Sequence, residues 1–341
     1  MKLSEFDYQL PNELIAQHPL QERDKCRLLV LDRASRRIEH KTFDSVAEYM
    51  MPGDCLVMNN TRVISARLFG RRKSGGKVEI FVLEKKDPVC EALVRPSGRL
   101  KEGERITLES GDTAELLGRG EVGRMVRFSR KLDDILEEAG HIPLPPYIGR
   151  MDRESDRDDY QTVYGTVEGA TASPTAGLHF TAQLMERVKG QGSRVKFVTL
   201  HTSYGTFAPV KSEDVAAHRM HKECFELPAE TIEAIRETKK RGGKVFAVGT
   251  TTARVLEHCA SQITHCSLRI TDYGGYTGLF IYPGYEFKVV DHLITNFHLP
   301  KSTLLLLVSA FAGKESIFEA YRQAIEAKYR FFSYGDAMLI L

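Results

Sequence analysis

Two short apolar segments define the start of the chain. Residues 27–31 end at Asp32, and residues 55–58 follow the turn Pro52-Gly53-Asp54. Apolar runs of this length between turn residues indicate buried β-strands. The polar stretch Asn59-Asn60-Thr61-Arg62 follows the second run directly. Side chains just beyond a strand end often carry function in α/β sheets, although the same stretch would also suit an ordinary surface turn.

The pattern changes between residues 64 and 150. Short segments of alternating character recur, separated by turns rich in Gly, Ser and Pro, at residues 66–70, 77–83, 91–94, 105–108 and 125–128. Strands at this spacing predict a small all-β barrel or sandwich. A helix over 132–139 ends at Gly140 and precedes a Pro-rich connector at 141–147.

After residue 150 apolar strands alternate with helical periodicity. Strands are predicted at 195–200, 244–248, 279–281, 292–294 and 337–341, and helices at 182–188, 229–240, 253–260, from 303 and at 317–329. This alternation indicates an α/β fold. We therefore predict a discontinuous α/β catalytic domain, residues 1–63 and 151–341, interrupted by a small antiparallel β-barrel domain over residues 64–150.

Composition narrows the class of protein. The chain has 341 residues, a net charge of +2 and 42% hydrophobic residues, as expected for a soluble globular protein. The N-terminus has acidic residues where a signal peptide needs an apolar run, and no apolar run is long enough to span a bilayer, so we expect a cytoplasmic protein without membrane contact. The six cysteines form no C-x-x-C pair.

A local basic cluster could contact phosphates or could simply be a solvated face: Arg67, Arg71, Arg72, Lys73 and Lys77.

The most unusual stretch is residues 173–181. It combines Pro174, Thr175, Gly177 and His179 without any amphipathic period, and a helical pattern follows it. A loop that leads into a helix N-terminus exposes unpaired N–H groups, which suit an anion. His179 could move a proton there.

Two further motifs carry candidate chemistry. His218 and His221 would share one face of a helix, with Glu223 nearby, which fits a metal site, acid–base work or merely a surface helix. The turn 249–252, with Thr250 and Thr251, follows a strand and could hold a phosphate or carboxylate. It lacks the G-K-[ST] ending of a P-loop, and the chain contains no G-x-G-x-x-G.

These motifs together resemble one family, the S-adenosylmethionine:tRNA ribosyltransferase-isomerases of queuosine biosynthesis. The matching runs extend from one end of the chain to the other in a single order, at residues 59–62, 144–148, 160–164, 174–181, 198–201, 218–223, 248–251, 279–285 with 290–291, 295–300, 302–305 and 329–338.

The resemblance implies a cytoplasmic enzyme with an α/β domain and an inserted β-barrel. The implied reaction transfers and isomerises the ribosyl moiety of S-adenosylmethionine, as co-substrate, onto 7-aminomethyl-7-deazaguanine at the tRNA wobble position. Epoxyqueuosine forms, while adenine and methionine leave. Because the sulfonium acidifies the C5′ proton, a base is needed there, and the departing adenine needs a proton. No metal is required, and we expect a monomer.

From residue chemistry we assign His179 or His201 to proton transfer, with His218, His221 and Glu223 as further candidates. Arg62, Thr250 and Thr251 would hold anionic groups. The remaining expected substrate contacts are Asn60, Pro174, Thr175, Gly177, Gly205, Thr206, Arg254, Asn296 and His298.

The sequence departs from the family pattern in the loop Thr202-Ser203-Tyr204, where a Val-Gly pair is usual, and at Gly278, where an Asp is common. Losing a glycine removes easy access to positive φ, so the loop beside His201 can differ in shape. Two other classes compete: a non-catalytic RNA-binding protein that uses the β insert, and an RNA methyltransferase that uses the same co-substrate.

Overall fold

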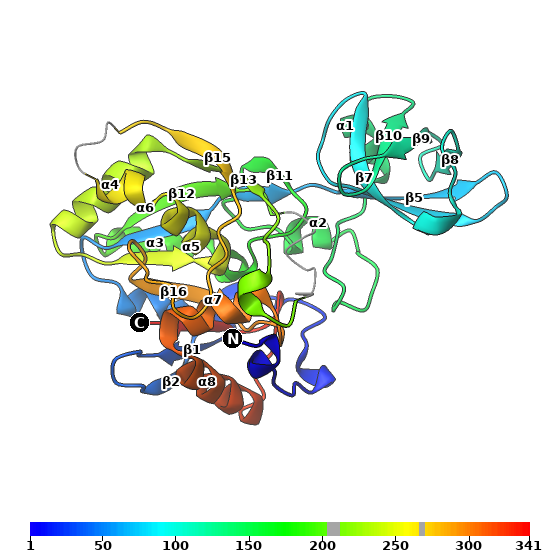
Figure 1. Ribbon diagram of the computed structural model, residues 1–341. Helices are drawn as coiled ribbons and strands as arrows, with labels where there is room; N and C mark the ends of the chain where they lie inside the picture. Colours follow the sequence, from blue (N-terminus) through cyan, green and yellow to red (C-terminus); the bar gives the residue numbers. More distant parts are fainter. Residues whose placement is uncertain (203–211, 266–269) are drawn as a thin grey trace.

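The computed structural model describes residues 1–202, 212–265 and 270–341. A large α/β body carries a small β-barrel that stands out to one side (Figure 1). This is the fold class predicted from the sequence, a mixed α/β sheet with an inserted antiparallel barrel. Within the described residues no helix has the length and apolar character needed to cross a membrane.

The centre of the α/β body is a nine-stranded mixed sheet. Its order is β15-β13-β12-β3-β14-β16-β17-β1-β2, in which β12, β3, β14 and β16 run parallel. The strands β3 and β14 are buried along their whole length, because helices cover both faces of the sheet. The strand bounds are β1 Arg27–Leu31, β2 Ile38–Thr42, β3 Cys55–Asn59, β12 Arg194–Leu200, β13 Glu223–Leu227, β14 Val245–Val248, β15 Tyr273–Thr277, β16 His292–Asn296 and β17 Ala337–Ile340.

Helices on the two faces of this sheet enclose two hydrophobic cores. One core lies under α4, α5, α7 and α8, and the other lies under α3 and the 3₁₀ turn η4 (Phe43–Tyr49). The helix bounds are α2 Asp156–Asp159, α3 Ala182–Gly190, α4 Ala229–Lys240, α5 Gly249–His258, α6 Ala260–Thr264, α7 Thr303–Ala312 and α8 Lys314–Glu326. The prediction for α4 is confirmed at both ends.

Six antiparallel strands close the barrel in the order β10-β7-β6-β5-β8-β9. Alternate side chains fill its interior, and α1 (Leu132–Ala139) packs its buried apolar residues on the same core. The sequence pattern missed one strand, β9. The strand bounds are β5 Arg67–Arg72, β6 Lys77–Val82, β7 Val89–Arg95, β8 Arg105–Leu108, β9 Thr113–Arg119 and β10 Arg124–Phe128.

A short parallel pair links barrel and α/β body. It consists of β4 (Thr61–Val63) and β11 (Val167–Ala170). Lys85 on the barrel contacts Asp133 of α1 at 2.6 Å and Glu168 of β11 at 3.1 Å, so one ammonium group joins the two parts of the molecule.

Three local predictions were wrong. Residues 279–281 form no strand, because β15 forms just before them and pairs with β13 at the sheet edge. Residues 218–222 are not helical, so His218 and His221 do not share a helix face. The helix predicted at 253–260 begins earlier, at Gly249, which places Thr250 and Thr251 in its first turn.

Candidate active site

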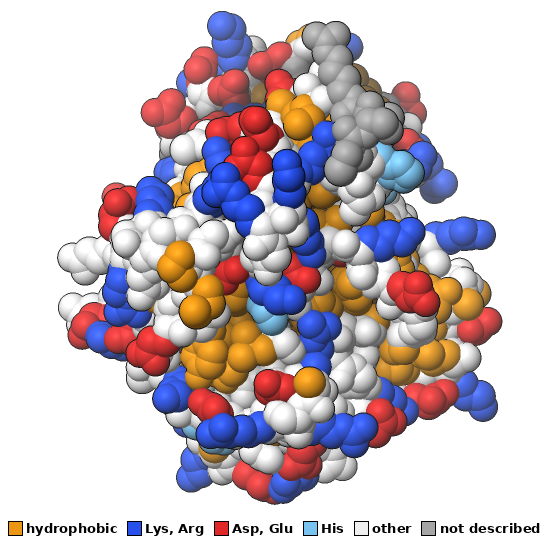
Figure 2. Space-filling model, turned by 90° about the vertical axis from the view of Figure 1, so that its left-hand side faces the viewer, with side chains coloured by type: hydrophobic (Ala, Val, Ile, Leu, Met, Phe, Trp, Pro, Cys, Tyr) orange, Lys and Arg blue, Asp and Glu red, His pale blue; other side chains and the backbone are white. Residues whose placement is uncertain are grey.

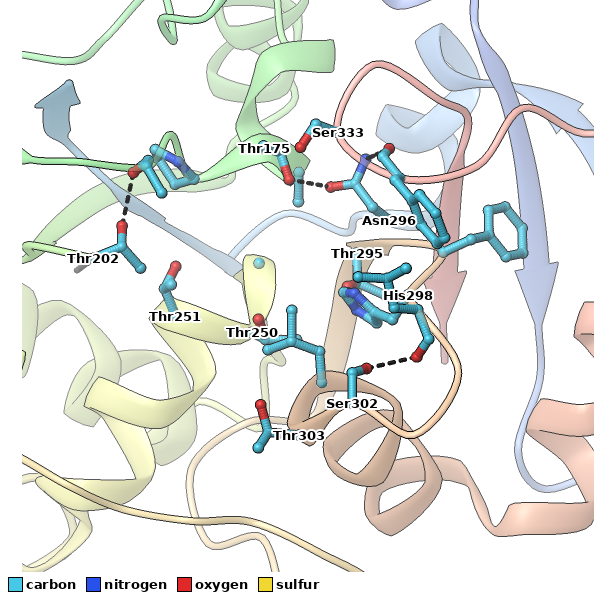
Figure 3. Close-up of a pocket in the computed structure, with 18 of the residues that line it drawn as sticks. Thr175, Thr202, Thr250, Thr251, Thr295, Asn296, His298, Ser302, Thr303 and Ser333 are labelled. Carbon is cyan, nitrogen blue, oxygen red and sulfur yellow. Dashed lines mark hydrogen bonds between the residues drawn. The ribbon is translucent and has the colours of Figure 1, made fainter. Parts of the chain in front are cut away.

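A cavity of about 380 Å³ opens at the carboxyl ends of β12, β14 and β16. Ligands in α/β sheets bind at this edge of the parallel strands. In Figure 3, Thr175, Asn296 and Ser333 lie along one side of the cavity, Thr250, Ser302 and Thr303 lie along the other, and His298 stands between them. The site is thus built from segments far apart in the sequence.

Two helices begin at this cavity, α5 and α7. The first turn of α5 has no side-chain cap, and it starts at Gly249 with φ of 86°, a conformation that glycine adopts without strain. Ser302 caps α7, and Lys301 precedes it. Uncapped N–H groups and the positive ends of two helices favour a negatively charged group.

None of the described residues that line the cavity is acidic. Its charged or titratable members are Tyr147, His298 and Lys301. The hydroxyl of Ser173 lies fully buried at the wall without a hydrogen-bond partner in the described part of the chain. A buried polar group without a partner is costly, so a ligand that pairs with Ser173 would be stabilised.

His298 is the one histidine of the chain whose residue lines this cavity; all eleven histidines lie within the described ranges. Its Nε2 lies 2.8 Å from the Thr295 hydroxyl, which fixes the ring orientation. Burial lowers the pKa of His298 to about 3, so the imidazole is neutral near pH 7.

His179, the first sequence candidate for proton transfer, lies behind the cavity wall. Its Nε2 accepts from the Asn296 side-chain amide at 3.1 Å, and its Nδ1 lies 3.2 Å from the Cys26 sulfur. The residue is 4% exposed, and burial lowers its pKa to about 3. With both ring nitrogens engaged, His179 reaches the cavity only through Asn296.

Asn296 is held in a single orientation by its neighbours. Its amide nitrogen also donates to the Phe332 carbonyl at 3.2 Å, and its oxygen accepts from the Thr175 hydroxyl at 2.8 Å. His179, Asn296 and Thr175 therefore form a hydrogen-bonded chain from the core to the cavity surface. Figure 3 shows the bond between Thr175 and Asn296.

Comparison with known proteins identifies the family. Residues 3–340 match the family model described as "Queuosine biosynthesis protein". A protein of Sulfurihydrogenibium sp. named S-adenosylmethionine:tRNA ribosyltransferase-isomerase is 51% identical over 344 residues, with 100% of both chains covered. A protein of the same name from Thermotoga maritima is 50% identical over 343 residues, again with 100% of both chains covered. The chain belongs to the queuosine biosynthesis protein family.

A solved structure supports the membership. The crystal structure of S-adenosylmethionine tRNA ribosyltransferase from Thermotoga maritima is similar with a TM-score of 0.57 and 41% identity, and the similarity covers 99% of this chain and 100% of that one. The family resemblance read from the sequence motifs is thereby confirmed.

Several of the expected contacts of this family member lie in the cavity wall: Pro174, Thr175, Thr250, Thr251, Asn296 and His298. Gly177 is buried against Tyr164, just behind them. The start of α3, where the sequence predicts an anion site, does not line this cavity, and the Thr181 side chain caps that helix by accepting from the Leu184 N–H group. Gly205 and Thr206 lie outside the described residues.

His201 and Asn60 make contacts between the pair β4–β11 and the neighbouring strand β12. The Nδ1 atom of His201 lies 2.8 Å from the Thr61 hydroxyl, and its ring packs on Gly169, where a Cβ would come within 2.9 Å of it. Burial lowers the pKa of His201. Asn60 accepts from the Thr199 hydroxyl at 2.7 Å. Arg62, on β4, makes no ion pair within the described ranges.

Glu223 and Arg254 form a buried ion pair beside the site. Their side chains are 2% and 4% exposed, and the contact is 2.5 Å long. Arg254 also donates to the Leu279 carbonyl at 3.1 Å. His218 packs edge-on against Phe280, and burial lowers its pKa, whereas His221 is exposed. Glu223 thus neutralises Arg254.

The sequence analysis did not select Tyr147, Ser173, Lys301, Ser302 or Ser333 as site residues, although all line the cavity. The sequence does contain a signal for Ser302, because a serine directly before a helical pattern is a typical N-cap and so marks the start of a helix. The pairing of Tyr147 with Ser333 at 2.6 Å joins residues 186 positions apart, so no local pattern could reveal it. Among the described residues, no group of three or more His, Cys, Asp or Glu side chains could hold a metal ion.

Proposed function

We propose that this chain transfers and isomerises the ribosyl moiety of S-adenosylmethionine onto 7-aminomethyl-7-deazaguanine at the tRNA wobble position. Epoxyqueuosine, adenine and methionine are the products. The observation that carries the proposal is full-length membership of the family, with about 50% identity to relatives named for this activity. The cavity at the carboxyl edge of the sheet is of the size that suits a small co-substrate.

The electrostatics of the cavity support S-adenosylmethionine as its ligand. The methionine carboxylate would lie at the N-termini of α5 and α7, near Thr250, Thr251 and Lys301. A neighbouring carboxylate side chain would compensate the sulfonium charge and make the C5′ proton less acidic. The described lining contains no such group, so the charge that activates the ribose is retained.

For proton transfer we propose His298 in place of His179. The imidazole of His298 lines the cavity, is neutral near pH 7, and is oriented by Thr295. A neutral imidazole can accept a proton. Burial lowers the pKa of both histidines, so the choice of His298 over His179 rests on its place in the cavity lining. We propose that His179 instead positions Asn296, which would hydrogen-bond the substrate. His201, His218, His221 and Glu223 would act at a distance, by shaping the wall.

The remaining parts of the proposal concern the setting of the reaction. The macromolecular substrate is a tRNA that carries 7-aminomethyl-7-deazaguanine, and Asn60, Arg62, Gly205 and Thr206 are proposed to contribute to its binding. We propose that the protein acts as a monomer in the cytoplasm. We also propose that it needs no metal, because the sulfonium of the co-substrate itself activates the ribose. We also propose the domain division 1–63 with 151–341, and 64–150.

One assay distinguishes this function from its alternatives. The protein is incubated with labelled S-adenosylmethionine and tRNA that carries the modified base, and with guanine-containing tRNA as the control. Release of free adenine and methionine with the modified tRNA alone is expected. S-adenosylhomocysteine as the product would establish a methyltransferase, and binding without turnover would establish an RNA-binding protein; either result refutes the proposal.

A further inference from the structure

A groove runs along the barrel toward the α/β body. Two hollows of about 720 and 300 Å³ share Glu79 and Arg95 in their walls, so they form one continuous depression, here called the barrel groove. Strands β5, β6 and β7 form its floor, and the Pro-rich connector 143–148 forms its far wall.

The barrel groove lies close to the active-site cavity. Pro146, Ile148 and Thr171 line the groove, and their chain neighbours Tyr147 and Ala172 line the cavity. The same two segments therefore separate the two hollows, and a ligand in the barrel groove would lie near the cavity.

The walls of the barrel groove are rich in positive charge. Five cationic side chains line it, against the two carboxylates Glu79 and Glu109; the cations are Arg67, Arg71, Lys77, Arg95 and Arg150. Arg67 contacts Glu79 at 3.2 Å, and Glu109 lies 3.2 Å from the Nε2 atom of His141. These contacts engage the acidic groups, but Arg67 is neutralised by Glu79 in turn, and Arg150 contacts Asp156 at 2.6 Å. Binding of an anion would therefore depend on Arg71 and Lys77.

Arg71 and Lys77 stand directly opposite each other on β5 and β6. Both are exposed, and neither makes an ion pair with a carboxylate in the described part of the chain. Like charges directly across a strand pair destabilise a sheet. A bound anion would relieve their repulsion. Anion binding therefore explains this pair of like charges, whereas packing within the barrel does not.

The face of the molecule opposite the barrel carries charges of both signs. Figure 2 shows the face turned away from the barrel, where Lys and Arg side chains are interspersed with Asp and Glu. Mixed charge of this kind does not attract a polyanion, whereas a groove with an excess of cations does.

We infer that the barrel groove binds the anticodon arm of tRNA through its phosphates and leads the wobble nucleotide to the cavity, an inference that rests on the proposed function. Phosphate contacts set the register of an RNA without reading its sequence, while the modified base is recognised after it leaves the stack. Arg71 and Lys77 would contact the stem, and the connector 143–148 would face the loop.

The test measures how tRNA binding to the full chain depends on salt. Each of Arg71→Ala and Lys77→Ala should weaken binding roughly fivefold to tenfold at about 0.1 M salt and reduce the slope of log K against log salt by about 1. The anticodon stem–loop should show the same losses, and an acceptor-stem minihelix should not. Lys41→Ala is the matched control, because this exposed lysine lies on the edge strand β2, far from the barrel.

A double variant with the wild-type salt slope and a wild-type melting temperature would overturn the inference, as would equal losses with the acceptor minihelix. The same preparations are assayed for adenine release as a function of tRNA concentration, where Arg71→Ala and Lys77→Ala should raise the KM for tRNA, whereas Lys41→Ala should leave kcat and KM near the wild-type values. Failure of the wild type to release adenine would refute the proposed function alone, since the binding data still decide the role of the barrel groove.

Discussion

Acidification should destabilise this protein through His179. Burial lowers the pKa of this imidazole to about 3 in the folded state, whereas an exposed histidine in the unfolded chain titrates near 6.5. Between these values the unfolded state binds more protons, so the free energy of unfolding rises with pH and falls on acidification. From about pH 7.5 to about pH 5, the contribution of His179 decreases by roughly 2 kcal/mol.

The assay is urea unfolding of the wild type and His179→Gln at several pH values in this range. Glutamine does not titrate, and its side-chain oxygen can still accept from the Asn296 amide. The difference in unfolding free energy between the two proteins should therefore change by about 2 kcal/mol across the range, at constant m-value. Parallel pH curves would show that His179 titrates equally in both states. They would refute the burial of His179 as a neutral group in the folded state.

Three further predictions follow from the site. His298→Gln should lower kcat by about a hundredfold or more while the KM for tRNA stays unchanged, measured by adenine release, whereas His292→Gln, at the start of β16, should leave kcat near the wild-type value. Arg254→Met should cost about 3–5 kcal/mol of unfolding free energy, because it removes the cation from a buried ion pair with Glu223; adding Glu223→Gln should recover part of this loss, and equal stability of single and double variants would contradict the reasoning. Gly177→Ala should cost about 1–3 kcal/mol in thermal or urea unfolding, since its Cβ would overlap a buried tyrosine hydroxyl; an unchanged stability would show that the loop shifts freely.

The local sequence pattern predicted an element correctly where the residues that start and end it lie in the same short segment. The helix over 229–240 begins after a proline and ends before two glycines, and the structure places α4 within the same bounds. The local pattern failed where pairing with a distant strand determines the secondary structure. Residues 279–281 are apolar enough for a strand, yet Tyr273–Thr277 takes the edge position beside β13 despite its two glycines.

The site shows the same division. The motif around His179 marked a functional region, but the orientation of its imidazole depends on Cys26 and Asn296, which are far away in the sequence. The anion-binding helix start was expected at α3, where Thr181 caps the helix locally. The cavity instead receives the starts of α5 and α7, because β14 and β16 deliver them to the same edge of the sheet.

By itself, the sequence determined the family, the α/β body with its inserted barrel, and most of the helices, since these depend on local periodicity, turn residues and long motifs. The tertiary structure decided which side chains meet. It buried His179 in the core, placed His298 at the cavity, and brought the barrel groove close to the cavity. These outcomes depend on strand order and on contacts between residues hundreds of positions apart, which no local pattern encodes.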